Sequence, residues 1–203
     1  GKLAAVGSPR ASLESNFALR TLAGAESFCT GVAEPERRLV GRFADAALAG
    51  AFHVPTLQEI EGCDAILVLG ADLTHEAPLL DLALFRAHAG AGATIHLVGL
   101  RTGRVGGFAA SFESGDPNSI ATRGRAIAAG LRADDGEDRV AAALAAAQRP
   151  LVITGTQHRY VEILEAAVAI VEALRARNGT DPWFAMAVSE ANTLGVELLD
   201  DRR

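Results

Sequence analysis

Residues suited to binding an anion follow the first short apolar run of the chain. Gly7 permits a tight turn, and Ser8, which precedes a proline, is a typical helix start; Ser12 is an alternative start one turn later. Backbone N–H groups at such a turn, together with the guanidinium of Arg10, are suited to binding phosphate. An ordinary strand-to-helix connection has the same pattern, so both interpretations stay open.

Three later apolar runs also end in residues that could contact a ligand. These ends read Gly70-Ala71-Asp72, Gly99-Leu100-Arg101-Thr102 and Thr154-Gly155-Thr156. Ligands of open α/β sheets bind at the carboxyl ends of strands, so we expect these segments to surround a binding site. A second guanidinium, that of Arg101, favours a phosphate, and pairing with an acid such as Asp72 is the alternative.

Several other kinds of chemistry lack their motifs. No GxGxxG or GxxxxGK[ST] follows a strand, which disfavours a nicotinamide dinucleotide site and a P-loop. Neither the two cysteines, Cys29 and Cys63, nor the histidines have the spacing of metal ligands, so no metal site is expected. His75-Glu76 is the one neighbourhood suggestive of acid–base chemistry, and no nucleophile is paired with a base. The sequence therefore predicts no catalytic residues.

Composition narrows the class of protein further. The 203 residues have a net charge of −6, which argues against a nucleic-acid partner. The apolar share of 49% is enough for a core of closely packed helices and strands. No apolar run reaches the roughly 20 residues that span a bilayer, so no direct membrane insertion is expected. Because the chain starts without Met, we expect a fragment of a longer polypeptide.

Strands and helices alternate along the chain. Strands are expected at residues 3–6, 27–30, 63–70, 93–99, 150–155 and 183–188, and helices at 12–23, 36–49, 56–61, 78–89, 119–130, 137–148 and 160–177. Residues 103–119 are expected to be an irregular loop. This order predicts an α/β fold, a layered Rossmann-like parallel sheet with helices on both faces. We expect a first lobe at residues 1–110 and a second at 111–203.

Taken together, the motifs resemble those of the molybdopterin-dinucleotide oxidoreductase superfamily. Residues 7–16 are similar to its first strand-to-helix turn, residues 63–72 to a strand whose end contacts the dinucleotide, and residues 92–102 to a third motif, with Gly99-Leu100 replacing the usual Asp-Pro. The resemblance implies a molybdopterin-oxidoreductase-like fold. It also implies that the dinucleotide-binding positions are Gly7, Ser8, Arg10, Asn16, Gly70, Asp72, Arg101 and Thr102.

Within that superfamily the chain is similar above all to the large iron–sulfur subunits of respiratory complex I, the NADH:quinone oxidoreductases. Residues 8–20 and 189–195 carry this likeness, which runs from residue 3 to residue 197 and is poor over 103–148. The resemblance implies other peripheral-arm subunits as partners and a peripheral location on the cytoplasmic side of the bacterial inner membrane. The iron–sulfur clusters of the parent subunit are expected outside this fragment, which itself has none.

A departure from the superfamily bears on activity. Catalytic members have a Cys, Ser or Asp metal ligand, usually followed by His, shortly after the region that matches residues 28–31, and residues 32–38 contain no such pair. The resemblance therefore implies a non-catalytic scaffold whose dinucleotide site is vestigial. Two alternatives stay open: an active pterin- or dinucleotide-binding domain of a molybdenum oxidoreductase, and the central domain of a thiamine-dependent enzyme, suggested by residues 149–155.

Overall fold

A parallel sheet of five strands forms the centre of the computed structural model, which describes residues 3–134, 136–179 and 181–200. The strand order is β5–β4–β3–β6–β7. The strands are Ala65–Leu69 (β3), Thr94–Gly99 (β4), Ser111–Ser114 (β5), Pro150–Gly155 (β6) and Trp183–Ala187 (β7). Ala65 of β3 is paired with Thr94 on one side and with Pro150 on the other. The expected α/β class with a parallel sheet is confirmed.

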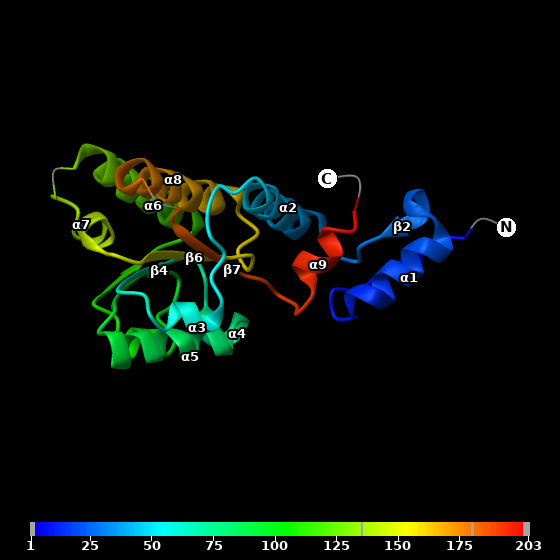
Figure 1. The fold of residues 1–203 in the computed structure, drawn as a ribbon, viewed down its shortest axis with the longest axis horizontal. Coiled ribbons are helices and arrows are strands. Elements are labelled where there is room, and N and C mark those ends of the chain that lie inside the picture. Colours follow the sequence, from blue (N-terminus) through cyan, green and yellow to red (C-terminus); the bar gives the residue numbers. More distant parts are fainter. Residues whose placement is uncertain (1–2, 135, 180, 201–203) are drawn as a thin grey trace.

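Helices cover both faces of this sheet (Figure 1). One face packs against α2 (Glu34–Leu48), α6 (Pro117–Ala133), α7 (Arg139–Ala146) and α8 (Val161–Asn178). The other packs against α3 (Leu57–Ile60), α4 (Leu73–Glu76) and α5 (Pro78–Arg86), which a π-helical turn at Ala87–Ala91 continues. Leu67 belongs to the first core and Ile66 to the second, and both are fully buried. A continuous apolar strand is typical of a sheet covered on both sides.

A smaller lobe lies at one end of the molecule (Figure 1). It contains β1 (Ala5–Val6), α1 (Leu13–Ala23), a 3-10 turn at Ala25–Ser27 and β2 (Phe28–Cys29), which is parallel to β1. The short helix α9 (Thr193–Glu197) returns to this lobe, where Val196 packs with Ala5 and Phe28. Of the two expected starts of α1, the structure has Ser12, whose hydroxyl accepts a hydrogen bond from the Ser15 N–H.

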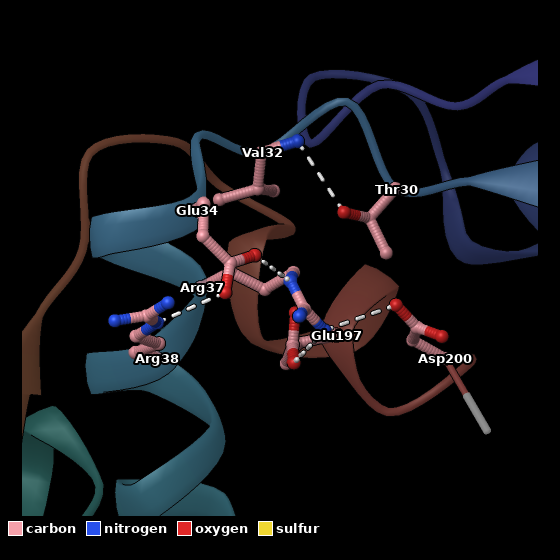
Figure 2. A network of polar contacts seen from close by, with 7 residues as sticks. All are labelled: Thr30, Val32, Glu34, Arg37, Arg38, Glu197 and Asp200. Carbon is pink, nitrogen blue, oxygen red and sulfur yellow. Dashed lines mark hydrogen bonds and ion pairs between the residues drawn. The ribbon is translucent and has the colours of Figure 1, made fainter. Parts of the chain in front are cut away.

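An arginine of α2 joins this helix to α9 and the residues after it, as Figure 2 shows. Arg37 Nη1 lies 3.2 Å from Asp200 Oδ2 and 3.7 Å from Glu197 Oε1, and its Nε donates to Glu34 Oε2 at 2.9 Å. Neighbouring Arg38 binds the other oxygen of Glu34. Because Glu197 and Asp200 lie in and after α9, this network fixes α9 against the first turn of α2.

Two expectations are corrected. The boundary expected between residues 110 and 111 does not separate two lobes, because β3 and β4 precede it, β5, β6 and β7 follow it, and all five form one sheet. The region expected to be irregular, residues 103–119, contains a 3-10 turn at Val105–Gly107, the edge strand β5 and the start of α6, which Asp116 caps.

No helix of the described residues is long and apolar enough to span a membrane.

Candidate binding cavity at the strand ends

A cavity of about 270 Å³ opens at the carboxyl end of the sheet. The chain leaves β3 toward β4 and later returns to β6 on the opposite side of β3, so β3 and β6 flank the point where the strand order reverses. Open α/β sheets bind ligands at such a point. The cavity is lined by residues that follow β3, β4 and β6: Gly70, Ala71, Asp72, Leu100, Arg101, Gln157 and His158.

Two glycines at the strand ends allow the close packing behind this cavity. Gly70 has a φ of +71°, and a Cβ there would lie 2.9 Å from the Cγ2 of Ile163. A Cβ on Gly155 would lie 2.8 Å from Oε2 of Glu76. A larger residue at either position would displace α8 or the Glu76 carboxylate, so the glycines are needed for the geometry of the cavity.

The carboxyl group beside the cavity with the clearest electrostatic signature is that of Glu76. Its Oε1 accepts a hydrogen bond from the Asp72 N–H at 2.7 Å. Burial raises the pKa of Glu76 to about 7, and the charges of Asp72 and Glu36 act in the same direction. The hydrogen bond from the Asp72 N–H opposes that rise. Glu76 thus holds a proton for part of the time at neutral pH.

Two threonine hydroxyl groups at the carboxyl end of β6 connect this strand to β3 and to α2. Thr156 is buried, and its hydroxyl lies 3.2 Å from Oε1 of Glu36 on α2 and 3.3 Å from the hydroxyl of Ser189. The buried Thr154 hydroxyl donates to the carbonyl of Leu69 at 3.0 Å and so joins β6 to β3. The segment Thr154-Gly155-Thr156 was expected to surround a binding site, but its hydroxyl groups bind other parts of the fold. The residues that follow it, Gln157 and His158, line the cavity instead.

The charged groups that face the cavity are mixed in sign. Asp72 is largely buried, and its Oδ2 lies 3.0 Å from Nδ1 of the exposed His75. Arg101 is exposed and has neither an ion pair nor a hydrogen bond with a described residue, so the expected alternative of an Arg101–Asp72 pair is not observed. Burial lowers the pKa of His158. A phosphate at Arg101 would share the cavity with Asp72.

The structure divides the eight expected binding positions into two groups. Gly70, Asp72 and Arg101 line the cavity, and Thr102 lies beside it against Gly106. Gly7, Ser8, Arg10 and Asn16 lie in the small lobe, and none of them lines the cavity. The motifs thus form turns at strand ends, as expected, but the turn at Gly7 and the turns after β3 and β4 do not line a common pocket.

The four small-lobe positions bind their own neighbours. Asn16 is buried, its Oδ1 accepts from the Ser8 N–H at 2.9 Å, and its Nδ2 donates to the carbonyls of Ser8 and Ser12 at 2.9 and 3.0 Å. A Cβ on Gly7 would lie 2.6 Å from Asn16 Oδ1. Arg10 forms an exposed ion pair with Glu190 at 2.7 Å. These side chains close the turn and attach it to the segment before α9.

The cavity fits a large cofactor poorly. Its volume of about 270 Å³ is below the roughly 300–1,000 Å³ typical of small-molecule sites. In the part of the chain that the structure describes, no cluster of three or more His, Cys, Asp or Glu could hold a metal ion. His75-Glu76 can be recognised in the sequence, whereas Gln157 and His158 cannot, because these two residues reach the cavity only through the pairing of β6 with β3.

Comparison with known proteins gives relatives for nearly the whole chain. No protein-family model matches it. It is 33% identical over 235 residues to the G subunit of NADH-quinone oxidoreductase from Salmonella typhimurium (strain LT2) and from Escherichia coli (strain K12), with 98% of this chain and 26% of each relative covered. The G subunit from Pseudomonas fluorescens is 34% identical over 233 residues, with 96% and 25% covered.

A solved structure has a similar fold. A chain of the formyltransferase/hydrolase complex FhcABCD from Methylorubrum extorquens, crystallised with methylofuran, aligns with a TM-score of 0.65 at 17% identity. The alignment covers 94% of this chain and 54% of that one, and at this identity it shows the fold alone. The sequence relatives are more informative, although the chain spans only about a quarter of their length. The chain is therefore a homologue of one segment of the NADH-quinone oxidoreductase G subunit.

Proposed function

We propose that this chain is a non-catalytic scaffold domain of the G subunit in an NADH:quinone oxidoreductase, where it supports electron transfer from NADH to quinone. The observation that carries the proposal is the 33% identity that extends over 98% of the chain. Similarity over nearly the full length means that the whole fold, and not one motif, is shared with the relatives. The cavity at the strand ends, with its mixed charges and small volume, supports the non-catalytic part of the proposal.

The proposal extends to the fold family and to cofactors. In it, the domain has a molybdopterin-oxidoreductase-like fold, supported by the motifs at residues 7–16, 63–72 and 92–102. Its dinucleotide-binding positions are vestigial, because Asn16 and Arg10 serve to close and attach a turn. The iron–sulfur clusters of the whole subunit are bound by other segments. The presence of only two cysteines, at Cys29 and Cys63, supports this assignment.

The partners in this proposal are other peripheral-arm subunits of the complex. The domain would lie on the cytoplasmic side of the bacterial inner membrane as a peripheral part of the assembly, without entering the bilayer. Its acidic net charge of −6 supports protein partners over nucleic acid. The whole complex, and not this segment, would oxidise NADH.

A second candidate is an active pterin- or nucleotide-binding domain that uses the cavity. It is favoured by the guanidinium of Arg101, which has no partner among the described residues, at the point where the strand order reverses. Calorimetry with GDP and with a guanine dinucleotide tests it, because Arg101→Ala would weaken real binding. The thiamine-enzyme alternative gains no comparable support, since its motif, residues 149–155, coincides with a buried strand that packs between β3 and β7.

A chimera tests the leading proposal. The matching segment of the G subunit from Escherichia coli (strain K12) is replaced by this chain, the complex is isolated through a tag on another subunit, and its protein and metal content are measured. We expect the chimera to copurify with the complex, in contrast to a polypeptide that lacks the segment, and to contain no molybdenum or tungsten. Stoichiometric molybdenum or tungsten with a pterin would contradict the non-catalytic assignment.

A further inference from the structure

Two exposed arginines follow β4 without a close carboxylate partner among the described residues. Arg101 is exposed and forms neither an ion pair nor a hydrogen bond there. The Arg104 side chain is 73% exposed, and its Nε lies 3.9 Å from Oδ2 of Asp81, which is beyond hydrogen-bond distance. By contrast, exposed arginines such as Arg10 and Arg86 pair with carboxylate oxygens at 2.7 and 2.8 Å. Two guanidiniums at the carboxyl end of the sheet are thus available to a partner.

The loop that carries these arginines is fixed to the helices beside it. We call residues 100–104 the basic loop. Its Gly103 has a φ of +55°, and the N–H of Arg104 donates a hydrogen bond to the Thr74 hydroxyl at 2.9 Å. That hydroxyl donates in turn to the buried carboxylate of Asp81 at 3.2 Å. Because α4 and α5 anchor the loop, a partner that binds it does not have to order its backbone.

The carboxyl groups near the basic loop lie beneath the surface. The side chains of Asp72 and Asp81 are only 11% and 3% exposed. Glu76 has a pKa of about 7, so its carboxyl is protonated for part of the time at neutral pH. The charges that the basic loop itself offers a partner are therefore positive. Protein interfaces are enriched in arginine, and opposite charges on two surfaces steer their encounter and select the partner.

The cavity beside the basic loop suits the side chains of a protein segment. Leu100, which is 53% exposed, lines it together with Arg101 and Asp72. Its volume of about 270 Å³ is below the roughly 300–1,000 Å³ of typical small-molecule sites. Because the Asp72 carboxylate lies in its wall, an anionic molecule that filled the cavity would bring like charges together. An acidic side chain that pairs with the exposed Arg101 instead keeps its charge at the surface.

We propose that the basic loop and the cavity beside it form a docking surface for an acidic segment of another subunit of the NADH:quinone oxidoreductase. Carboxylates of that segment pair with Arg101 and Arg104, and an adjoining side chain covers Leu100 and enters the cavity. This inference rests on the proposed function, because it takes the partner from the complex, and it adds the chemistry by which that partner is recognised.

The lysine content of this chain allows a direct test. Lys2 is its only lysine, so a lysine introduced elsewhere can be followed without background when a carbodiimide joins amines to adjacent carboxylates. Arg101→Lys is introduced into the Escherichia coli chimera, the assembled complex is treated with carbodiimide, and cross-linked peptides are identified by mass spectrometry. We expect a link from residue 101 to an Asp or Glu of another subunit. The matched control is Arg86→Lys, which should link only to Glu61 of this chain, the present partner of Arg86.

A second substitution tests the charge of the basic loop and separates docking from folding. Arg104→Gln, added to Arg101→Lys, is expected to lower the yield of the link to the other subunit about threefold, the effect of one exposed ion pair. Arg38→Gln, which removes an exposed arginine of α2, should leave that yield unchanged. In the chain alone, Arg104→Gln should leave the urea unfolding midpoint nearly unchanged, because the Arg104 side chain is exposed.

The outcomes distinguish this proposal from the proposed function. An assembled chimera in which residue 101 gives no link, or links only to the G polypeptide itself, overturns the docking surface and leaves the scaffold function standing. A link whose yield does not respond to Arg104→Gln overturns it as well. Links between two copies of the isolated chain, without a link to another subunit, would assign the basic loop to a second copy. A chimera that does not assemble contradicts the scaffold function, and the docking proposal falls with it.

Discussion

Replacing Glu76 with glutamine should stabilise the protein above neutral pH and have little effect in mild acid. The folded protein raises the pKa of this carboxyl from 4.5 to about 7, chiefly through burial. Between these two pH values the folded state binds more protons than the unfolded state, so the free energy of unfolding falls as pH rises from about 4.5 to about 7. Glutamine keeps the acceptor for the Asp72 N–H and has no charge to desolvate.

The size of the effect follows from the same shift. One pKa unit corresponds to about 1.4 kcal/mol, so the full change is worth about 3.4 kcal/mol. Solvent reaches part of the Glu76 side chain, and screening reduces the expected value to about 1–2 kcal/mol. Urea unfolding of the wild type and Glu76→Gln at pH 5, 6, 7 and 8 measures the difference between them. Glu172→Gln, on the exposed face of α8, is the matched control.

The difference in unfolding free energy between Glu76→Gln and the wild type is expected to grow with pH and to level off near pH 8. A constant difference from pH 5 to pH 8, or one in which the wild type becomes the more stable protein at high pH, would refute burial as the cause of the raised pKa. A pH dependence that also appears in Glu172→Gln would assign the effect to the overall charge.

Three further predictions concern the small lobe and its attachment. Gly31→Ala should cost at least about 3 kcal/mol in urea unfolding, because Gly31 has a φ of +76° and a Cβ would lie 2.2 Å from the Gly7 carbonyl oxygen; Gly50→Ala, with a φ of +70° and open space, should cost about 1 kcal/mol. Asn16→Ala should lower stability by about 2–3 kcal/mol, since it leaves the partly buried Ser8 backbone groups without the partners that Asn16 supplies; no loss in calorimetry would contradict this. Arg37→Ala should destabilise by about 2–4 kcal/mol and speed hydrogen exchange in α9, while the more exposed Arg38→Ala should do neither.

The central strands could be predicted because their signal is local. Residues 65–69 are apolar without interruption, and a run of this length that ends at a glycine is typical of a strand buried on both faces. The edge strand β5, with the sequence Ser-Phe-Glu-Ser, has no such run and lies between glycines, so it resembles a loop. Its pairing with β4 is a tertiary contact that the local pattern does not contain.

The candidate site could be predicted only in part for a related reason. The polar ends of β3 and β4 can be identified from their sequence, and they do line one cavity. The turn at Gly7 has the same local pattern, but among the residues that the structure describes β1 pairs with β2 and not with the large sheet. The local sequence therefore could not show that the positions around Gly7 lie apart from those that follow β3 and β4. Gln157 and His158 line the cavity only because β6 pairs with β3.

The activity of one chimeric variant tests the scaffold assignment most directly. The Escherichia coli chimera is compared with the same chimera carrying Asp72→Asn and Arg101→Ala, which alter the cavity without touching the core. NADH-driven quinone reduction is measured in membranes with matched amounts of assembled complex. A non-catalytic scaffold predicts rates equal within about twofold, because about 0.4 kcal/mol at most is at stake. A loss of about tenfold or more with assembly intact would contradict the account and assign chemistry to the cavity.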